Sequence, residues 1–557
     1  METRRLVLVL TGLAVAVIVV IGVLAAVVAG GGDGGGSSNN PDNGTPTVET
    51  SPLPERIEGE LRLFGPDPIT LDPACASDAS SAEYIVEVFS GLVSFDRDLK
   101  LIPDIAEKWD LSDDGRVYTF HLRNNVLFHD GSRRVTAGDF KFSMERALNP
   151  RTLSTVGEVY LDDIVGAKEF ARGETDSVSG IKVVNDNTLE ITIDERKEFF
   201  LAKLTYPTGY VVDQREVGDA TCFEGANWTL KPNGTGPFKL SKWVVGQRME
   251  LEANEDYYLD PKPSLAKVTY VLAGGSPLTM YENNEVDLAP VGVNDIERIR
   301  DPSESLNKEF VEKESMNVFY IGFNIEEPPF NDPNVRKALA MGLDKETLAT
   351  VVLKDLVTPA GGILPPGFPG FNEDLQGVPF DKDEARRLLD DAGGPDVLKD
   401  VTLLTSGRGA SAGPILEAII AMWEENLGVT IALEQEDFAT FLGDLDEGRF
   451  QMYDLGWVAD YPDPQNFLDI KFQSDSANNE TGYSNGEVDG LLEDARTEKN
   501  EQTRFRLYQQ AEQLIVNDSA WIPLYHSKSN SLIKPYVKNY DLPPFVIPNL
   551  RYVTISR

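Results

Sequence analysis

Short stretches of alternating apolar and polar residues predict half-buried β-strands in the first half of the chain. In residues 117–123 the side chains of Tyr118, Phe120 and Leu122 fall on one face of an extended chain. Residues 188–193 repeat the same alternation. Each segment therefore predicts a strand with one face against a core.

Apolar residues at helical spacing predict helices, most clearly in the second half. Residues 381–392 begin at Asp381 as an N-cap and end at Gly393. Residues 415–427 and 504–516 carry similar apolar faces. Strands and helices interleave without a strict βα repeat, and 557 residues are too many for one core. The pattern predicts an α/β protein of several domains.

The N-terminus reads as a membrane segment followed by a tether. Arg4 and Arg5 precede residues 6–29, which are 24 uncharged and mostly apolar residues, enough to span a bilayer. The arginines place residues 1–5 in the cytoplasm, so we expect an uncleaved anchor and an extracytoplasmic protein. Cleavage of a signal peptide followed by secretion is the alternative. The Gly-, Ser- and Pro-rich residues 30–56 predict a flexible tether.

Composition excludes some functions. The net charge of −40 disfavours binding to nucleic acid, and its simplest interpretation is solubility. Two cysteines, Cys75 and Cys222, are too few for a multi-cysteine metal site. Outside the cytoplasm they are either bonded or free, and the sequence alone does not decide between these states.

Catalytic motifs are missing from the sequence. The histidines are His121, His129 and His526, and no two of them have metal-ligand spacing. The chain lacks the motifs of serine hydrolases, zinc proteases and phosphate-binding loops. We therefore expect a binding protein without metal or cofactor, and keep an extracellular hydrolase as the alternative.

One stretch has the character of a socket for a cation. In residues 452–468 a short apolar strand carrying Trp457 runs into Ala-Asp-Tyr-Pro-Asp-Pro. Asp460 lies three residues past Trp457, at the exit of the strand, where side chains are free to face a cleft. A carboxylate beside an aromatic ring suits a cationic group. A plain surface turn is the other interpretation of these residues.

Many short stretches, taken in order, resemble one family. They are Leu71-Asp-Pro73, Phe89-Ser-Gly-Leu-Val93, residues 101–109, 118–123, 129–131, 135–140, 234–238, 324–330, 335–339, 457–461, 483–485 and 522–525. Together they resemble the family 5 solute-binding proteins of ABC importers, which include oligopeptide-, dipeptide- and nickel-binding members. The resemblance runs from about residue 61 to residue 552.

The resemblance implies a periplasmic-binding-protein-like, two-lobed clamshell of class II type with an additional inserted domain. Lobe I would consist of residues 57–90, 211–275 and 526–557, the inserted domain of 91–210, and lobe II of 276–525. The resemblance further implies a monomer that closes on a solute and presents it to the permease and ATPase subunits of an importer.

The ligand residues implied by the resemblance centre on Asp460. Trp457-Val-Ala-Asp-Tyr461 is similar to the oligopeptide-binding branch, in which the aspartate binds the free α-amino group of the peptide. Trp457, Phe438 and Tyr525 would then be aromatic walls of the cleft, with core packing as the alternative role.

Three positions depart from that branch. Asp454 stands where the branch has an arginine, Val156 where a tyrosine is expected, and Ser77 where an acid is expected. The length of the bound peptide and the way in which its C-terminal carboxylate is recognised therefore stay open. The acidic residues at 454 and 460 make basic peptides a further possible ligand. An oligosaccharide, a metal chelate, or a receptor role without transport remain the alternatives.

Overall fold

The computed structural model describes residues 53–272, 275–407 and 412–556. The predicted anchor at 6–29 and most of the tether lie outside these residues. Within the described part of the chain, no helix combines the length and apolar character needed to cross a bilayer.

The first sheet joins segments that are far apart in the sequence. Its order is β1 (Glu60–Phe64), β10 (Lys267–Val271), β9 (Arg248–Ala253) and β8 (Phe238–Val244). β1 and β10 are parallel and the other pairs antiparallel. Helix α2 (Ala79–Val88) begins at Asp78, whose side chain accepts a hydrogen bond from the Ser81 N–H. The core between this helix and the sheet includes Leu61 and Tyr270, which lie more than 200 positions apart.

A second sheet is built from the segments predicted by alternation. Its order is β4 (Ala106–Leu111), β5 (Val117–Leu122), β7 (Thr188–Thr192) and β6 (Ile181–Asn185). Tyr118, Phe120 and Leu122 are buried, as predicted. Helix α3 (Ala137–Leu148) packs on this core behind a capping box of Thr136 and Asp139.

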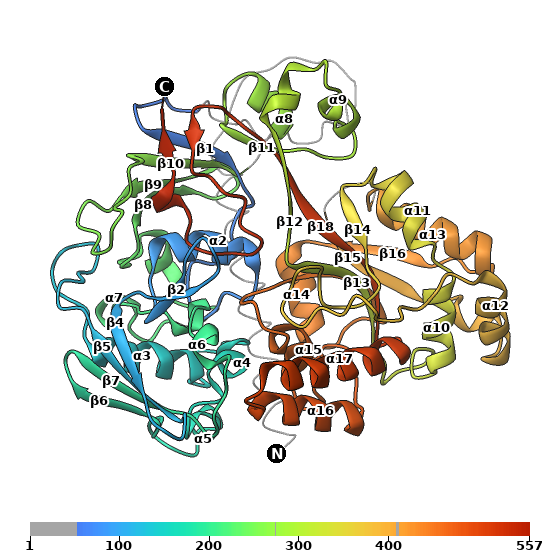
Figure 1. The fold of residues 1–557 in the computed structure, drawn as a ribbon, viewed down its shortest axis with the longest axis horizontal. Coiled ribbons are helices and arrows are strands. Elements are labelled where there is room, and N and C mark those ends of the chain that lie inside the picture. The colour runs from blue at the N-terminus through green and yellow to red at the C-terminus, as the bar shows by residue number, and fades with distance from the viewer. Residues whose placement is uncertain (1–52, 273–274, 408–411, 557) are drawn as a thin grey trace, which may run out of the picture. The chain divides into compact units, whose positions relative to one another are not determined.

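The largest sheet has eight strands. Its main path is β11 (Leu288–Pro290), β18 (Trp521–Ile533), β13 (Asn317–Phe323), β17 (Met452–Val458), β15 (Thr402–Ser406) and β16 (Ala432–Glu436), and β12 (Phe310–Glu314) and β14 (Val357–Pro359) also pair with β18. β18 continues without a break across the predicted lobe boundary at residue 526 (Figure 1). The lobe boundaries stay predictions.

Helices cover the eight-stranded sheet, and the predicted ones are present. They include α10 (Pro333–Met341), α12 (Lys382–Asp391), α13 (Pro414–Leu427), α16 (Gly486–Thr497) and α17 (Glu501–Asn517). Asp381 caps α12 by accepting hydrogen bonds from the backbone N–H groups of Asp383 and Glu384. Trp423 of α13 is fully buried, so this helix packs through the apolar face that its sequence predicts.

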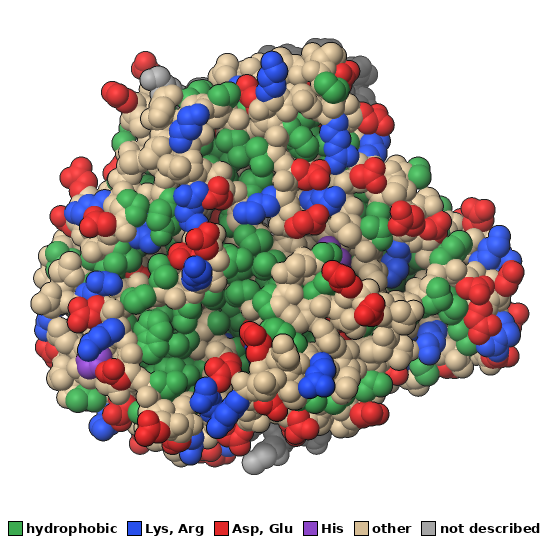
Figure 2. Space-filling model, viewed as in Figure 1, with side chains coloured by type: hydrophobic (Ala, Val, Ile, Leu, Met, Phe, Trp, Pro, Cys, Tyr) green, Lys and Arg blue, Asp and Glu red, His purple; other side chains and the backbone are tan. Residues whose placement is uncertain are grey.

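The remaining elements are shorter. They are β2 (Val93–Phe95), β3 (Leu101–Pro103), α4 (Gly157–Leu161), α5 (Ala167–Ala171), α6 (Phe200–Lys203), α7 (Gln214–Val217), α8 (Pro277–Glu282), α9 (Ile296–Arg300), α11 (Lys345–Thr347), α14 (Phe438–Asp446), α15 (Gln465–Phe472), β19 (Val537–Lys538) and β20 (Thr554–Ile555). Cys75 and Cys222 form a disulfide, the bonded state of the two that the sequence leaves open. On the face shown in Figure 2, acidic and basic side chains are interspersed.

Candidate ligand-binding site

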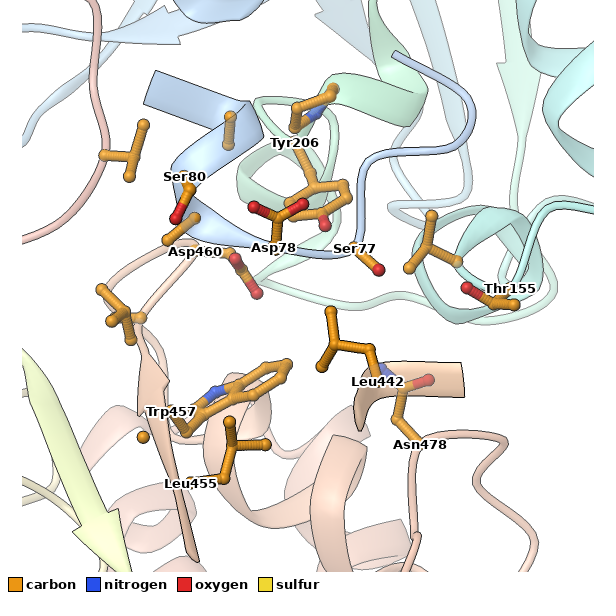
Figure 3. A pocket seen from close by; sticks show the side chains of 18 of the residues that line it. Ser77, Asp78, Ser80, Thr155, Tyr206, Leu442, Leu455, Trp457, Asp460 and Asn478 are labelled. Carbon is orange, nitrogen blue, oxygen red and sulfur yellow. The ribbon is translucent and has the colours of Figure 1, made fainter. Parts of the chain in front are cut away.

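A cavity lies where segments from the first 210 residues meet the end of β17. Its volume is about 1200 Å³, which includes the part that is open to solvent. One wall is the start of α2 with α4 and the turn at 205–207, and the opposite wall is α14, β17 and the turn after it. Figure 3 shows Asp78, Ser80 and Tyr206 on the first wall, with Trp457 and Leu442 facing them.

Asp460 places a carboxylate in this cavity. Its Oδ2 accepts hydrogen bonds from the Tyr160 hydroxyl (2.6 Å) and the Asn466 side-chain amide (2.8 Å). Its backbone N–H donates to the Asn466 Oδ1 (3.0 Å), which fixes the turn after β17. Among the described residues, Oδ1 accepts no hydrogen bond and no Lys or Arg forms an ion pair with the carboxylate. One oxygen is therefore held by neutral donors, and the other has no hydrogen bond from the described residues.

Burial raises the pKa of Asp460 to about 6, even though the hydrogen bonds from Asn466 and Tyr160 act to lower it. The charge of Lys471 also acts to lower it but forms no ion pair with Asp460, and the loss of water outweighs these effects. An ammonium group entering the cavity would reverse that penalty. The site is thus electrostatically prepared for a cation.

Tyr160 is one of the residues at this site that the sequence interpretation missed. It lies on α4, one helical turn after Val156, and both residues line the cavity. Its ring stacks on Tyr206 with 3.6 Å between ring centroids, and the Tyr206 hydroxyl donates to the Ala76 carbonyl (2.8 Å). The four-residue spacing from Val156 was the only signal in the sequence.

Trp457 faces the cavity, as Figure 3 shows, and is fixed by the turn that follows it. Its Nε1 donates to the Asn466 carbonyl (3.1 Å). The ammonium of Lys471 lies 4.3 Å from the centre of its ring and pairs with Glu480 at 2.5 Å. Lys471 and Glu480 also line the cavity, and sequence reasoning identified neither of them.

Phe438 lines the cavity from the first turn of α14. Asp437 caps this helix, and its side chain accepts a hydrogen bond from the Thr440 N–H. Leu442, one turn after Phe438, continues the apolar wall. This wall gives the cavity an apolar side opposite the polar start of α2.

Asp454 and Tyr525 do not line this cavity. The part of β17 that lines it begins at Leu455 and runs through Val458, so Asp454 lies one residue before the lining segment. Tyr525 on β18 instead stacks on Phe319, with 4.9 Å between ring centroids. Their roles toward a ligand stay predictions of the sequence.

The charged side chains that line the cavity are mostly acidic. Asp78, Asp446, Asp460 and Glu480 line it, against the single cation Lys471. Burial raises the pKa of Asp78 and brings that of Asp446 to about 6. Since Lys471 is already paired with Glu480, the remaining charge favours a cationic over an anionic ligand.

The histidines lie apart from one another. His121 contacts Asp110 at 2.7 Å, His129 the Gly236 carbonyl at 3.0 Å, and His526 the Asn317 carbonyl at 2.7 Å. Within residues 53–272, 275–407 and 412–556, no three His, Cys, Asp or Glu side chains gather in a way that could hold a metal ion.

A discontinuous α/β architecture with a cavity between segments far apart in the sequence is typical of binding proteins that close around a ligand. Residues 100–479 match the family described as bacterial extracellular solute-binding proteins, family 5 (middle). The chain belongs to this family.

Curated relatives match most of the chain. A probable deoxycholate-binding periplasmic protein of Escherichia coli is 31% identical over 487 residues, which are 86% of this chain and 89% of the relative. The periplasmic oligopeptide-binding protein OppA of Salmonella typhimurium is 30% identical over 502 residues, which are 86% of this chain and 89% of the relative. These relatives are periplasmic binding proteins.

Solved structures agree with the fold. The murein tripeptide-binding protein MppA of E. coli superposes with a TM-score of 0.80 at 28% identity, covering 89% of this chain and 98% of that one. An oligopeptide-binding protein of Borrelia burgdorferi superposes with a TM-score of 0.81 at 28% identity, covering 89% of this chain and 100% of that one. The predicted two-lobed α/β clamshell and the family are therefore confirmed.

Proposed function

We propose that this protein captures peptides in the cavity at Asp460 and delivers them to the permease of an ABC importer. The observation that carries the proposal is the Asp460 carboxylate, which faces the cavity with one oxygen held by Tyr160 and Asn466 and no cation bonded to it. The free α-amino group of a peptide is the group that fits this socket. Trp457 and Phe438 supply apolar walls for side chains.

The relatives support a peptide over other solutes. Those that resemble this chain include proteins named for oligopeptides, dipeptides and murein peptides. One is named for deoxycholate and another for heme, and both of those molecules carry carboxylates. The excess of acidic side chains in the cavity disfavours such anions.

Calorimetry with three probes tests the proposal. Trialanine should bind, N-acetyl-trialanine should lose about 2–5 kcal/mol because the ammonium is gone, and deoxycholate should bind weakly. Equal affinity for trialanine and its acetylated form would contradict the role of Asp460. Tight deoxycholate binding with no peptide binding would assign the protein to a different solute.

We infer further that residues 6–29 hold the protein at the outer face of the membrane as a monomeric binding subunit without catalytic activity. The uncharged run after Arg4 and Arg5 supports the tether. The full-length protein should fractionate with membranes, and a variant that lacks residues 6–29 should not be retained there. Recovery of the full-length chain in soluble form with residues 6–29 removed by the cell would instead identify a signal peptide.

A further inference from the structure

A second cavity of about 1080 Å³, including its opening, adjoins the first one. The two cavities share Ala79 and Ser80 at the start of α2, Val458 at the end of β17, and Val546. Val458 lies two residues before Asp460. A ligand held at Asp460 therefore has a second space beside it.

Two glutamates of α2 line this second cavity. Glu83 and Glu87 follow Ser80 at three and seven residues, so all three lie on one face of the helix. The helical rise places Glu83 only about 4.5 Å along the axis from Ser80. Burial brings the pKa of both glutamates to about 7, and the charge of Glu87 adds to the effect on Glu83.

Glu87 presents an unpartnered oxygen. The side chain is 2% exposed, and its Oε1 accepts hydrogen bonds from the backbone N–H groups of Asn549 (2.8 Å) and Leu550 (3.0 Å). Its Oε2 is buried and has no hydrogen-bond partner among the described residues. A buried polar oxygen without a partner is costly, and a donor supplied by a ligand would remove that cost.

No cation of the described chain neutralises this pair. Neither Glu83 nor Glu87 forms an ion pair with any Lys or Arg whose placement the structure describes. The charge of Arg551 acts to lower the pKa of Glu87, but burial outweighs it. Its guanidinium lies over the rings of Tyr257 and Tyr552 instead, at 5.8 and 4.5 Å from their centres.

We propose that the second cavity binds a cationic side chain, and that the preferred ligand is a peptide whose first residue is lysine or arginine. The inference rests on the proposed function, because Asp460 must hold the α-amino group. The peptide backbone then occupies the first cavity, while the side chain of the first residue passes Ser80 and Val458 toward Glu83 and Glu87. An ammonium or guanidinium supplies the donor that Glu87 Oε2 lacks.

Glu512 provides a matched control. It is also 2% exposed, and its Oε1 accepts hydrogen bonds from two successive backbone N–H groups, those of Ile363 (2.7 Å) and Leu364 (2.8 Å). Burial likewise brings its pKa to about 7. It lines neither of the two cavities. It therefore reproduces the structural role of Glu87 without the ligand role.

The test is calorimetry on the full-length protein at pH 7.5 with Lys-Ala-Ala, norleucine-Ala-Ala and Ala-Ala-Lys. The wild type should bind Lys-Ala-Ala about tenfold or more tightly than norleucine-Ala-Ala, whose side chain has similar length without charge. Ala-Ala-Lys should not share that advantage. Glu83→Gln and Glu87→Gln should each reduce the lysine-to-norleucine ratio, and Glu512→Gln should keep it.

The ratio is measured within each variant, so partial loss of folded protein cancels from it. Equal affinity for Lys-Ala-Ala and norleucine-Ala-Ala, or an unchanged ratio in both the Glu83→Gln and Glu87→Gln variants, would overturn the basic-residue inference and leave peptide binding standing. Absence of binding by all three peptides would contradict the proposed function itself, and the inference with it.

Discussion

Asp460 and Asp163 are both withdrawn from water, but their surroundings differ in one respect. Asp163 is 5% exposed and contacts two ammonium groups, those of Lys197 and Lys203, each at 2.5 Å. Asp460 contacts only a hydroxyl and an amide. Burial acts to raise both pKa values; at Asp163 the two lysines outweigh it and hold the pKa well below its usual range, whereas that of Asp460 rises to about 6.

The difference is that between a structural ion pair and the binding group that we propose Asp460 to be. The cations of Asp163 come from the chain, so its charge is compensated whenever the protein is folded. Asp460 lies at a cavity, and its compensating cation has to arrive from outside. Removing the charge of Asp163 should therefore lower the stability of the protein, whereas removing the charge of Asp460 should lower its affinity for the ligand.

The largest expected effect is on the free energy of unfolding. Asp163→Asn removes the buried carboxylate that Lys197 and Lys203, which is 1% exposed, share, and should cost about 3–5 kcal/mol. Denaturant unfolding of the ligand-free protein measures this loss. A cost below about 1 kcal/mol would show that the existing ion pairs of Lys197 with Asp194 (2.8 Å) and of Lys203 with Asp162 (3.1 Å) are enough to compensate both lysines.

Asp460→Asn should act on binding instead. The affinity for trialanine should fall by about 2–5 kcal/mol, while the free energy of unfolding should not fall, because an unpaired buried carboxylate is replaced by a neutral side chain. Calorimetry and denaturant unfolding of the same preparation separate the two readouts. Loss of stability with retained affinity would reverse the assignment.

Tyr160→Phe removes one donor from the Asp460 carboxylate but keeps the ring that stacks on Tyr206. Hydrogen bonds to charged groups contribute about 1.5–3 kcal/mol, so affinity for a free-amino peptide should fall by an amount in that range. Tyr206→Phe is the comparison, since its hydroxyl bonds to the Ala76 carbonyl and not to Asp460. Equal losses in both variants would mean that packing of the rings, and not the bond to Asp460, matters.

The pH dependence of peptide affinity is the smallest and most gradual of the expected effects. Binding needs the ionised Asp460 and a protonated α-amino group, so affinity should be highest near pH 7 and should fall as pH drops through about 6, by about 1.4 kcal/mol per unit below that pKa. It should also fall above about pH 8, where the α-amino group of the peptide loses its proton. Asp460→Asn should flatten the acidic part of the profile. A wild-type affinity that is constant between pH 5 and 7.5 would contradict the titration of Asp460.

Local patterns in the sequence determined several features by themselves. Alternation in residues 117–123 and the cap at Asp381 require only neighbours along the chain, and both appear as predicted. The stretch from Trp457 to Asp460 predicted a cation socket because an apolar strand ends there beside a carboxylate. Family membership also followed from short stretches taken in order.

Only the tertiary structure decided which side chains meet. Tyr160 and Asp460 are 300 residues apart, and their hydrogen bond depends on how α4 lies against the end of β17. Asp454 does not line the cavity although it lies only three residues before Trp457, because the lining part of β17 begins at Leu455. Whether a charged side chain is buried, and which partners it has, depends on contacts between segments that are far apart in the chain. For that reason the sequence alone pointed to Asp460, but not to Tyr160, which donates a hydrogen bond to it, or to the glutamates of α2 beside the cavity.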